Sequence, residues 1–393
     1  MAMIRDTMRL VGPPGSNKVM AGELSRIVRR GLDGHRLAEP KKAGTGALVY
    51  PFEPEVALLA VSYCRTASRV LWDLYESRAD RLEPLYDELA ADAAEDRRGW
   101  LWNGASISIR PRNLGGFPAG ERQVVGAVKN ALVNGAAARG LELCVDPDRP
   151  DILVAVRMHD DAVTVSVDLG GKALHQRGYR RDGGVAPLRE NLAAILVMLT
   201  RLDARRELLV DPMTGSGTIA IEAALMGRGE PLWSPPRRPA ALALPAFRGL
   251  APRAQPLFGD TEPLVIAAEI DRRTAAAARG NIAAAGADRW VRLLPGDFRE
   301  IGRERVEALA AAAGRAGQGG VILVNPPYGG RLDRDDPVPL YRELGAWCRR
   351  FSGWRAGVLV AHRGFERAFG GRPRIVKPLS NASQPTTFYL YDL

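Results

Sequence analysis

The chain has 393 residues, enough for two or three domains, and its 46% hydrophobic residues can form a full core. Lys and Arg number 55 against 45 Asp and Glu, and this excess of +10 favours a polyanionic partner such as RNA. The 3 cysteines and 4 histidines are scattered, which argues against a disulfide framework and a metal site. The N-terminus has no signal-peptide core, and no apolar run approaches about 18 residues. We therefore expect a reduced, cytoplasmic protein without a membrane segment.

The first 170 residues predict a small α+β region. Residues 1–50 are basic, rich in Gly and Pro, and carry no known motif. Helical periodicity is expected at about 21–32, 54–75, 82–100 and 123–138, and short β-branched or alternating runs predict strands at 106–110, 152–156 and 163–167. A sheet with a helix over residues 100–170 suits an accessory binding module better than a catalytic domain.

From about residue 188 the pattern changes to strands alternating with helices, which is typical of a doubly wound parallel α/β sheet. Strands are expected at 208–210, 264–268, 291–294, 321–324 and 357–361, helices at 218–226, 273–285 and 340–351, and a closing β-hairpin at 374–377 and 387–391.

Residues 231–256 interrupt this order. They hold seven prolines together with Arg237 and Arg238, so we expect neither a regular helix nor a central strand there. The segment leaves near the carboxyl ends of the strands, where such folds bind ligands. It is interpreted either as a plain surface loop or as a basic lip over the substrate.

The strongest motif is Asp-Pro-Met-Thr-Gly-Ser-Gly-Thr at 211–218, between a predicted strand and a predicted helix. Its glycines allow a tight turn and close approach of the backbone to a ligand. Residues 215–220 also fit a dinucleotide fingerprint, but Asp211 stands four residues before the first glycine. A carboxylate there suits the cationic amino and sulfonium groups of S-adenosylmethionine. The cofactor-binding candidates of this motif are Asp211, Pro212, Met213, Thr214, Gly215, Ser216, Gly217 and Thr218.

Carboxylates also follow the next two predicted strands. Glu269, at the end of its strand, is expected to accept hydrogen bonds from a ribose diol. Asp271 either joins this site or caps the following helix. Asp297, in a Gly-Asp-Phe turn, is expected to accept a bond from the adenine amino group.

The catalytic candidates are Asn325, Pro326, Pro327 and Tyr328, directly after a predicted strand. A base amino group is a poor nucleophile because its lone pair is delocalised into the ring. The Asn325 side-chain oxygen and the Pro326 carbonyl can accept hydrogen bonds from its N–H groups and so direct the lone pair toward the methyl group. Tyr328 offers an aromatic face on which the base can stack. The site relies mostly on positioning, and Asn325 also borders the cofactor. No cysteine lies near these motifs, which argues against methylation of a ring carbon through a thiolate.

Residues 211–218 and 325–328 together resemble the class I amino-methyltransferases. With Leu-His-Gln-Arg-Gly-Tyr-Arg at 174–180 and Ala-Pro-Leu-Arg-Glu-Asn-Leu-Ala-Ala at 186–194, the chain is similar to THUMP-containing RNA guanine-N2 methyltransferases. The nearest resemblance is to those acting on bacterial 23S rRNA. It covers about residues 55–391.

This resemblance implies a ferredoxin-like region at 1–75, a THUMP RNA-binding domain at 76–172 and a Rossmann-like methyltransferase domain at 173–393. It also implies that Pro187 and Leu188 line the cofactor pocket. The residues expected to face RNA are Arg177, Tyr179, Arg180, Arg237, Arg238 and Arg331. The first 50 residues match the family poorly. Because the chain ends at Leu393, the second methyltransferase fused to some relatives is expected to be absent.

Other interpretations stay open at this point. The same plan serves tRNA guanine-N2 methyltransferases, and a catalytically silent RNA-binding assembly factor would share the fold. Asn-Pro-Pro-Tyr also serves DNA adenine-N6 enzymes, although residues 174–194 favour RNA. A nicotinamide oxidoreductase is the weakest alternative.

Overall fold

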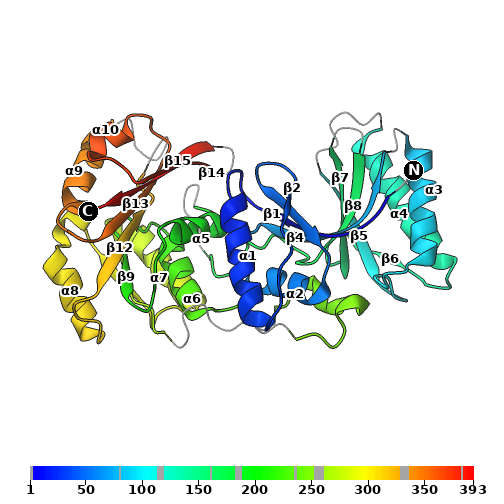
Figure 1. Cartoon of the computed structure of the whole chain (residues 1–393), viewed down its shortest axis with the longest axis horizontal. Coiled ribbons are helices and arrows are strands. Elements are labelled where there is room, and N and C mark those ends of the chain that lie inside the picture. Colours follow the sequence, from blue (N-terminus) through cyan, green and yellow to red (C-terminus); the bar gives the residue numbers. More distant parts are fainter. Residues whose placement is uncertain are drawn as a thin grey trace. The chain divides into compact units, whose positions relative to one another are not determined.

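The structure is a computed structural model that describes residues 3–78, 81–112, 119–159, 162–181, 188–233, 237–251, 261–327, 336–381 and 384–393 (Figure 1). The chain forms two compact units, each assembled from segments far apart in the sequence. The first unit comprises Met1–Val11, Ile27–Leu174 and Pro231–Ala254, and the second comprises Gly12–Arg26, His175–Glu230 and Gln255–Leu393.

The first unit contains an eight-stranded sheet in the order β2-β3-β1-β4-β8-β7-β5-β6. Its strands are β1 (Met3–Val11), β2 (Lys41–Lys42), β3 (Ala47–Pro51), β4 (Arg69–Ser77), β5 (Ser106–Arg112), β6 (Cys144–Val145), β7 (Ile152–His159) and β8 (Ala162–Asp168). β5 runs parallel to β6 and β7, and the other neighbours pair antiparallel. The division expected at residue 75 falls inside β4, so one sheet joins the strands on its two sides.

Helices α1 (Asn17–Gly31), α2 (Pro54–Tyr63), α3 (Leu82–Glu95) and α4 (Glu121–Ala137) come from the same part of the chain. α3 and α4 pack closely because Gly135 of α4 leaves room, since a Cβ there would lie 2.5 Å from the Ala90 carbonyl oxygen. The helix expected over 54–75 is wrong beyond Tyr63, where β4 follows. Most of β4 is buried on both faces, and such an apolar run does not distinguish a strand from a helix.

The Pro-rich segment packs within the first unit. The N–H of Leu232 donates to the Ser62 carbonyl (2.8 Å), and the N–H of Ala241 donates to the Leu169 carbonyl (2.8 Å). The Phe247 ring lies edge-on to Trp72, with 6.3 Å between centroids. The segment includes two short 3-10 helices, Ala240–Ala243 and Pro245–Phe247. Its described residues are thus an integral part of the first unit rather than a plain loop.

The second unit contains a seven-stranded sheet in the order β11-β10-β9-β12-β13-β15-β14. Its strands are β9 (Glu207–Asp211), β10 (Val265–Glu269), β11 (Val291–Pro295), β12 (Gly319–Val324), β13 (Arg355–Val360), β14 (Ile375–Asn381) and β15 (Gln384–Asp392). β9 to β13 are parallel, and β15 is antiparallel to both its neighbours. The chain leaves β9 toward β10 on one side and returns to β12 on the other, so the strand order reverses between β9 and β12.

Two hydrophobic clusters cover the two faces of this sheet. The first gathers residues of α5 (Glu190–Leu199), α6 (Thr218–Arg228) and α7 (Arg272–Ala284), and includes Leu209 of β9. The second gathers residues of α8 (Arg303–Ala312), α9 (Val338–Cys348) and α10 (Phe365–Phe369), and includes Leu208 and Val210. The side chains of successive β9 residues therefore belong to hydrophobic clusters on opposite faces of the sheet. This is the three-layer α/β architecture expected from the alternation of strands and helices.

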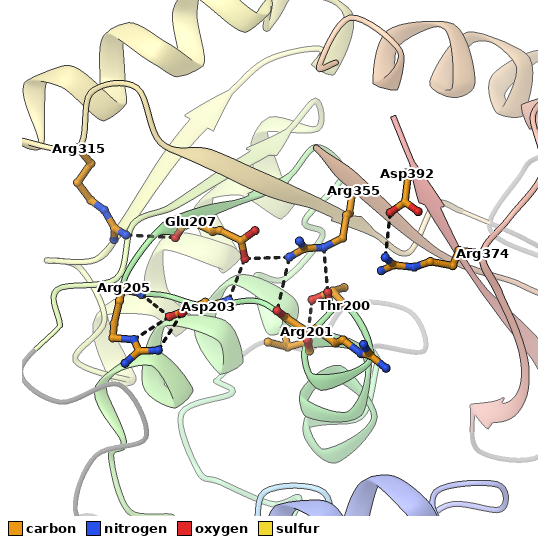
Figure 2. Close-up of polar contacts among 10 residues, drawn as sticks. Thr200, Arg201, Asp203, Arg205, Glu207, Arg315, Arg355, Arg374 and Asp392 are labelled. Carbon is orange, nitrogen blue, oxygen red and sulfur yellow. Dashed lines mark hydrogen bonds and ion pairs between the residues drawn. The ribbon is translucent and has the colours of Figure 1, made fainter. Parts of the chain in front are cut away.

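Arginines tie together the amino ends of the parallel strands (Figure 2). Arg355, at the start of β13, donates to the Thr200 carbonyl (3.1 Å) and pairs with Glu207 at the start of β9 (2.8 Å). Arg315 donates to the backbone carbonyls of Ala204 (2.6 Å) and Glu207 (3.2 Å). These interactions connect the segments at the amino ends of the strands. The motifs lie at the opposite edge of the sheet, at the carboxyl ends.

Candidate active site

The motifs meet at the carboxyl ends of adjacent strands. Asp211 ends β9 and pairs in register with Ala267 of β10, which ends at Glu269. On the other side of β9, Val210 pairs with Ile322, so Asn325 follows β12 beside the end of β9. This is the point at which the strand order reverses, where open α/β sheets form their ligand crevice.

Two glycines shape the turn between β9 and α6. Gly215 and Gly217 adopt φ angles of 55° and 86°, which residues with a Cβ rarely tolerate. The turn is closed by a bond from the Gly217 N–H to the Thr214 carbonyl (2.9 Å), and Thr214 N–H donates to the Ala268 carbonyl across the end of β10 (2.8 Å). The backbone is therefore held close to the ends of both strands.

Asp211 is fully buried in this turn. Burial raises the pKa of its carboxyl to about 7, and the nearby Glu269 adds to the rise. The Thr214 hydroxyl and the Met213 N–H lower the pKa. Even so, neither Asp211 oxygen has a well-formed hydrogen bond within the described part of the chain. A buried carboxyl in this condition is suited to receive a cationic or hydrogen-bonding ligand.

Two further buried acceptors lie in the same loops. Neither the Thr214 Oγ1 nor the Asn325 Oδ1 has a well-formed hydrogen bond among the residues described. Buried polar atoms are normally satisfied, so unpaired ones at a crevice indicate places for ligand groups. Pro326 is buried and Pro327 is partly buried, which leaves Asn325 on a stiff support.

Glu269 and Asp271 shape the turn after β10. The two Glu269 carboxylate oxygens accept from the N–H groups of Gly215 (2.9 Å) and Asp271 (3.0 Å). Asp271 caps α7 by accepting from the Thr274 N–H (2.7 Å), and hydrogen bonds from the Thr274 side chain and backbone lower the pKa of its carboxyl. Of the two roles considered for Asp271, the structure shows the cap. Glu269 links the glycine turn to β10 and keeps lone pairs for a ligand.

The Asp297 carboxylate interacts with Arg299, two residues later in the chain. It accepts from the Arg299 N–H (2.9 Å) and pairs with the Arg299 guanidinium (2.6 Å). Arg299 also pairs with Glu343 of α9 and lies 5.1 Å from the centre of the Phe298 ring. The carboxylate is held after β11, as the spacing predicts.

The residues at 177–180 do not project outward as expected. Arg177 is buried and pairs with Glu222 of α6 (3.4 Å), and Tyr179, also buried, donates to the same carboxylate (3.1 Å). Arg180 donates to the Leu188 carbonyl (2.7 Å) and to Thr218 Oγ1 (3.2 Å). The expectation that Arg177 and Tyr179 face RNA is therefore wrong, because the buried Glu222 carboxylate holds both inside.

Asn281 of α7 was missed in the sequence. Its side chain accepts from the Arg181 N–H (2.9 Å) and donates to the Ser216 carbonyl (3.0 Å), bridging two segments of the second unit. An asparagine within an alanine-rich helix gives no motif, because both partners lie far away in the chain.

Ile270 was also missed. It stands between Glu269 and Asp271, and 65% of its surface is exposed. An apolar residue between two acidic residues after a strand is the only signal for it in the sequence.

The other predicted residues fall in different places. Leu188 is buried, and Arg237 and Arg238 belong to the first unit. Pro187, Tyr328 and Arg331 lie outside the described residues. Among the residues that the structure describes, no group of His, Cys, Asp and Glu side chains could hold a metal ion. No helix in those same ranges is long and apolar enough to cross a membrane.

A family model of the methyltransferase domain, UPF0020 (RMKL-like), matches residues 177–388, more than half of the chain. The match spans both the glycine turn and Asn325. The chain belongs to this family. The open α/β sheet of this RMKL-like methyltransferase domain is that of the class I methyltransferases.

Curated relatives named ribosomal RNA large subunit methyltransferase K/L are similar over nearly the whole chain. The one from Syntrophotalea carbinolica is 31% identical over 97% of this chain and 53% of its own length. The one from Methylococcus capsulatus is 31% identical over 94% of this chain and 50% of its own. The chain thus spans about half the length of the curated relatives it matches.

Among solved structures, a possible methylase from Clostridium difficile 630 matches with a TM-score of 0.76 and 27% identity over 98% of both chains. The structure of SMU.472 complexed with SAH matches with a TM-score of 0.80 and 22% identity, over 99% of this chain and 98% of that one. Both likenesses extend beyond the methyltransferase sheet to the first unit.

Proposed function

We propose that this protein transfers a methyl group from S-adenosylmethionine to the exocyclic N2 of a guanine in 23S rRNA. The observation that carries the proposal is the set of buried, unpaired acceptors on Asp211, Thr214 and Asn325, beside the strand reversal of a methyltransferase-family domain. The names of the relatives, ribosomal RNA large subunit methyltransferases, support the substrate.

The residues around the glycine turn fit this cofactor. When bound, S-adenosylmethionine supplies a methyl group on a cationic sulfonium, whose departure leaves a neutral thioether. Asp211 and Thr214 offer buried acceptors to its charged amino group, and Glu269 offers lone pairs to its ribose diol. Ile270 offers an exposed apolar surface for the adenine ring. The ligand of the solved SMU.472 structure, SAH, supports the same assignment.

Asn325 and Pro326 act on the nucleophile. The Asn325 Oδ1 and the Pro326 carbonyl oxygen each accept a hydrogen bond from one N–H of the base amino group. This holds the nitrogen in place and turns its lone pair toward the methyl group, so the acceleration comes mainly from orientation. Tyr328 stacks on the base after it leaves its helix, as in other enzymes that extrude their target.

The first unit grips the RNA in this proposal. The chain carries a charge of +10, and cationic side chains gain affinity for RNA by releasing condensed counterions. The predicted ferredoxin-like and THUMP regions fall mostly within this unit, whose single sheet would let them bind RNA as one body.

The decisive experiment is methyl transfer from labelled S-adenosylmethionine to unmodified 23S rRNA and to tRNA, each digested to nucleosides. We expect labelled N2-methylguanosine from the 23S rRNA. The same nucleoside from tRNA alone would replace the substrate and keep the chemistry. Cofactor binding without label in either RNA would favour a silent assembly factor, and labelled N6-methyladenosine would overturn the guanine assignment.

A further inference from the structure

Two cations from distant segments of the first unit lie against one indole ring. The Lys172 Nζ is 5.6 Å from the centre of the Trp233 ring, and the Arg237 guanidinium carbon is 5.9 Å from it. The ring is held in place, because Trp233 is 8% exposed and its Nε1–H donates to the Val61 carbonyl (2.8 Å).

The backbone fixes the approach of the two segments. After β8 the chain turns at Gly171, whose φ of +69° suits glycine and whose N–H donates to the Asp168 carbonyl (3.1 Å). A Cβ on Gly171 would lie 3.0 Å from that of Ala240, so the turn sits tightly against the Pro-rich segment. Lys172 is consequently presented beside Trp233 by a rigid turn.

The surroundings of Lys172 are positive. Partial burial lowers the pKa of its amino group, and the positive charge of Arg237 lowers it further. The Trp233 ring lies beside this amino group, and Arg237 is close enough for its charge to act on it. The nearest carboxylate along the chain, Asp168, is buried and paired with Arg69. Two like charges that share a ring repel each other, and an anion between them would relieve this repulsion.

We propose that Lys172, Trp233 and Arg237 form a phosphodiester-binding site, the Trp233 site, for the backbone of the RNA substrate. The ring attracts both cations through its negative face and holds them at one place. A phosphate contact of this kind fixes the position of the RNA without reading its sequence. The inference rests on the proposed function, because it takes RNA as the substrate.

The test measures the affinity of the full-length protein for in vitro transcribed 23S rRNA over a series of KCl concentrations. We expect Lys172→Gln and Arg237→Gln each to weaken binding and to reduce the slope of log K against log salt by about 1. Lys172→Arg should restore the slope because it keeps the charge. Arg97→Gln is the matched control, since Arg97 is exposed in the same unit and pairs with Glu95 (2.9 Å).

A slope for Lys172→Gln equal to that of Arg97→Gln would overturn the site. So would a Lys172→Arg variant that binds as weakly as Lys172→Gln, since that loss would report packing instead of charge. If the wild-type protein methylates 23S rRNA while the slopes stay equal, the site fails and the proposed function stands. If it methylates only tRNA, the proposed substrate fails, and the same variants measured on tRNA decide the site.

Discussion

Asp211 combines full burial with a carboxyl that lacks well-formed hydrogen bonds in the described structure, and burial raises its pKa to about 7. Its folded pKa lies above the unfolded value, so the stability it contributes is present at low pH and lost as pH rises through 7. A cationic ligand needs the ionised form. The same group therefore opposes folding and favours cofactor binding near neutral pH.

We predict that the affinity for S-adenosylmethionine falls about fivefold between pH 7 and pH 6, because Asp211 is about half ionised at pH 7 and mostly protonated at pH 6, where binding must release its proton. Asp211→Asn should bind the cofactor weakly with little dependence on pH over this range. In the absence of ligand it should melt at a higher temperature than wild type at pH 8. Calorimetric titration and thermal melts measure both effects, and a wild-type affinity that is constant from pH 6 to 7 would contradict the assignment.

Asn325 offers a buried acceptor directly after β12. We predict that Asn325→Ala leaves cofactor binding largely intact and lowers methyl transfer by orders of magnitude, because Asn325 acts on the target amino group. Cofactor affinity and single-turnover transfer separate the two effects. Asn134→Ala is a suitable control, since that exposed side chain lies in the first unit, where it donates to the Tyr86 hydroxyl (2.6 Å). A large loss of cofactor affinity in Asn325→Ala would refute this role.

At the scale of elements, α6 is held by a buried polar network as well as by its apolar faces. Glu222 is fully buried and receives both Arg177 (3.4 Å) and Tyr179 (3.1 Å). Thr218, in the first turn, accepts from Arg180 (3.2 Å). Because α6 begins at the glycine turn, this network keeps the cofactor loop in register with the helix.

We predict that Arg177→Met lowers the free energy of unfolding by about 3–5 kcal/mol, because it leaves the Glu222 carboxylate buried without its cation. Arg177→Met combined with Glu222→Leu should recover part of this loss. Denaturant unfolding measures the stability. The salt slope of RNA binding should stay at the wild-type value, whereas a decrease of about 1 would show that Arg177 contacts a phosphate.

Strands and helices of the second unit were largely predictable, whereas the strands near the N-terminus were not. The strands β9, β10 and β12 are apolar runs bounded by turn residues, because helices cover both faces of their sheet. In β1, by contrast, Met8 and Leu10 alternate with Arg9, which is buried only because it pairs with Asp73 of β4 (2.5 Å). That partner lies 64 residues away, and the alternation is too short to predict a strand over residues 3–11.

At the scale of the whole molecule, each unit is built from segments that do not follow one another in the chain. Gly12–Arg26 belongs to the second unit, where Val19 packs against the cluster that covers one face of the methyltransferase sheet. Gly15, at a φ of +83°, approaches the backbone of β14 so closely that a Cβ would lie 2.9 Å from the Pro378 carbonyl oxygen. The methyltransferase fold is thus completed by residues from near the start of the chain.

We predict that Gly15→Ala destabilises the protein by more than the roughly 1–2 kcal/mol that a left-handed residue costs, because the new methyl group also meets the Pro378 carbonyl. Gly34→Ala is the matched control, with a φ of +69° and no heavy atom within 4 Å of the added Cβ. Thermal unfolding of the two variants measures the difference. Equal melting temperatures would mean that residues 12–26 do not pack on β14.

The sequence by itself determined the α/β class, the order of the parallel strands along the chain, and the motifs around Asp211, Glu269 and Asn325. It could do so because adjacent parallel strands bring their carboxyl ends to one edge, so residues that follow each strand share a site. Only the tertiary structure decided that Arg177 lies inside the protein, that Asp271 caps α7 and that the Pro-rich segment completes the first unit. The roles of Arg177 and the Pro-rich segment depend on partners distant in the chain, and the role of Asp271 depends on where α7 begins. The sequence gives the chemical nature of each side chain, but the packing of the whole fold determines which residues that side chain contacts.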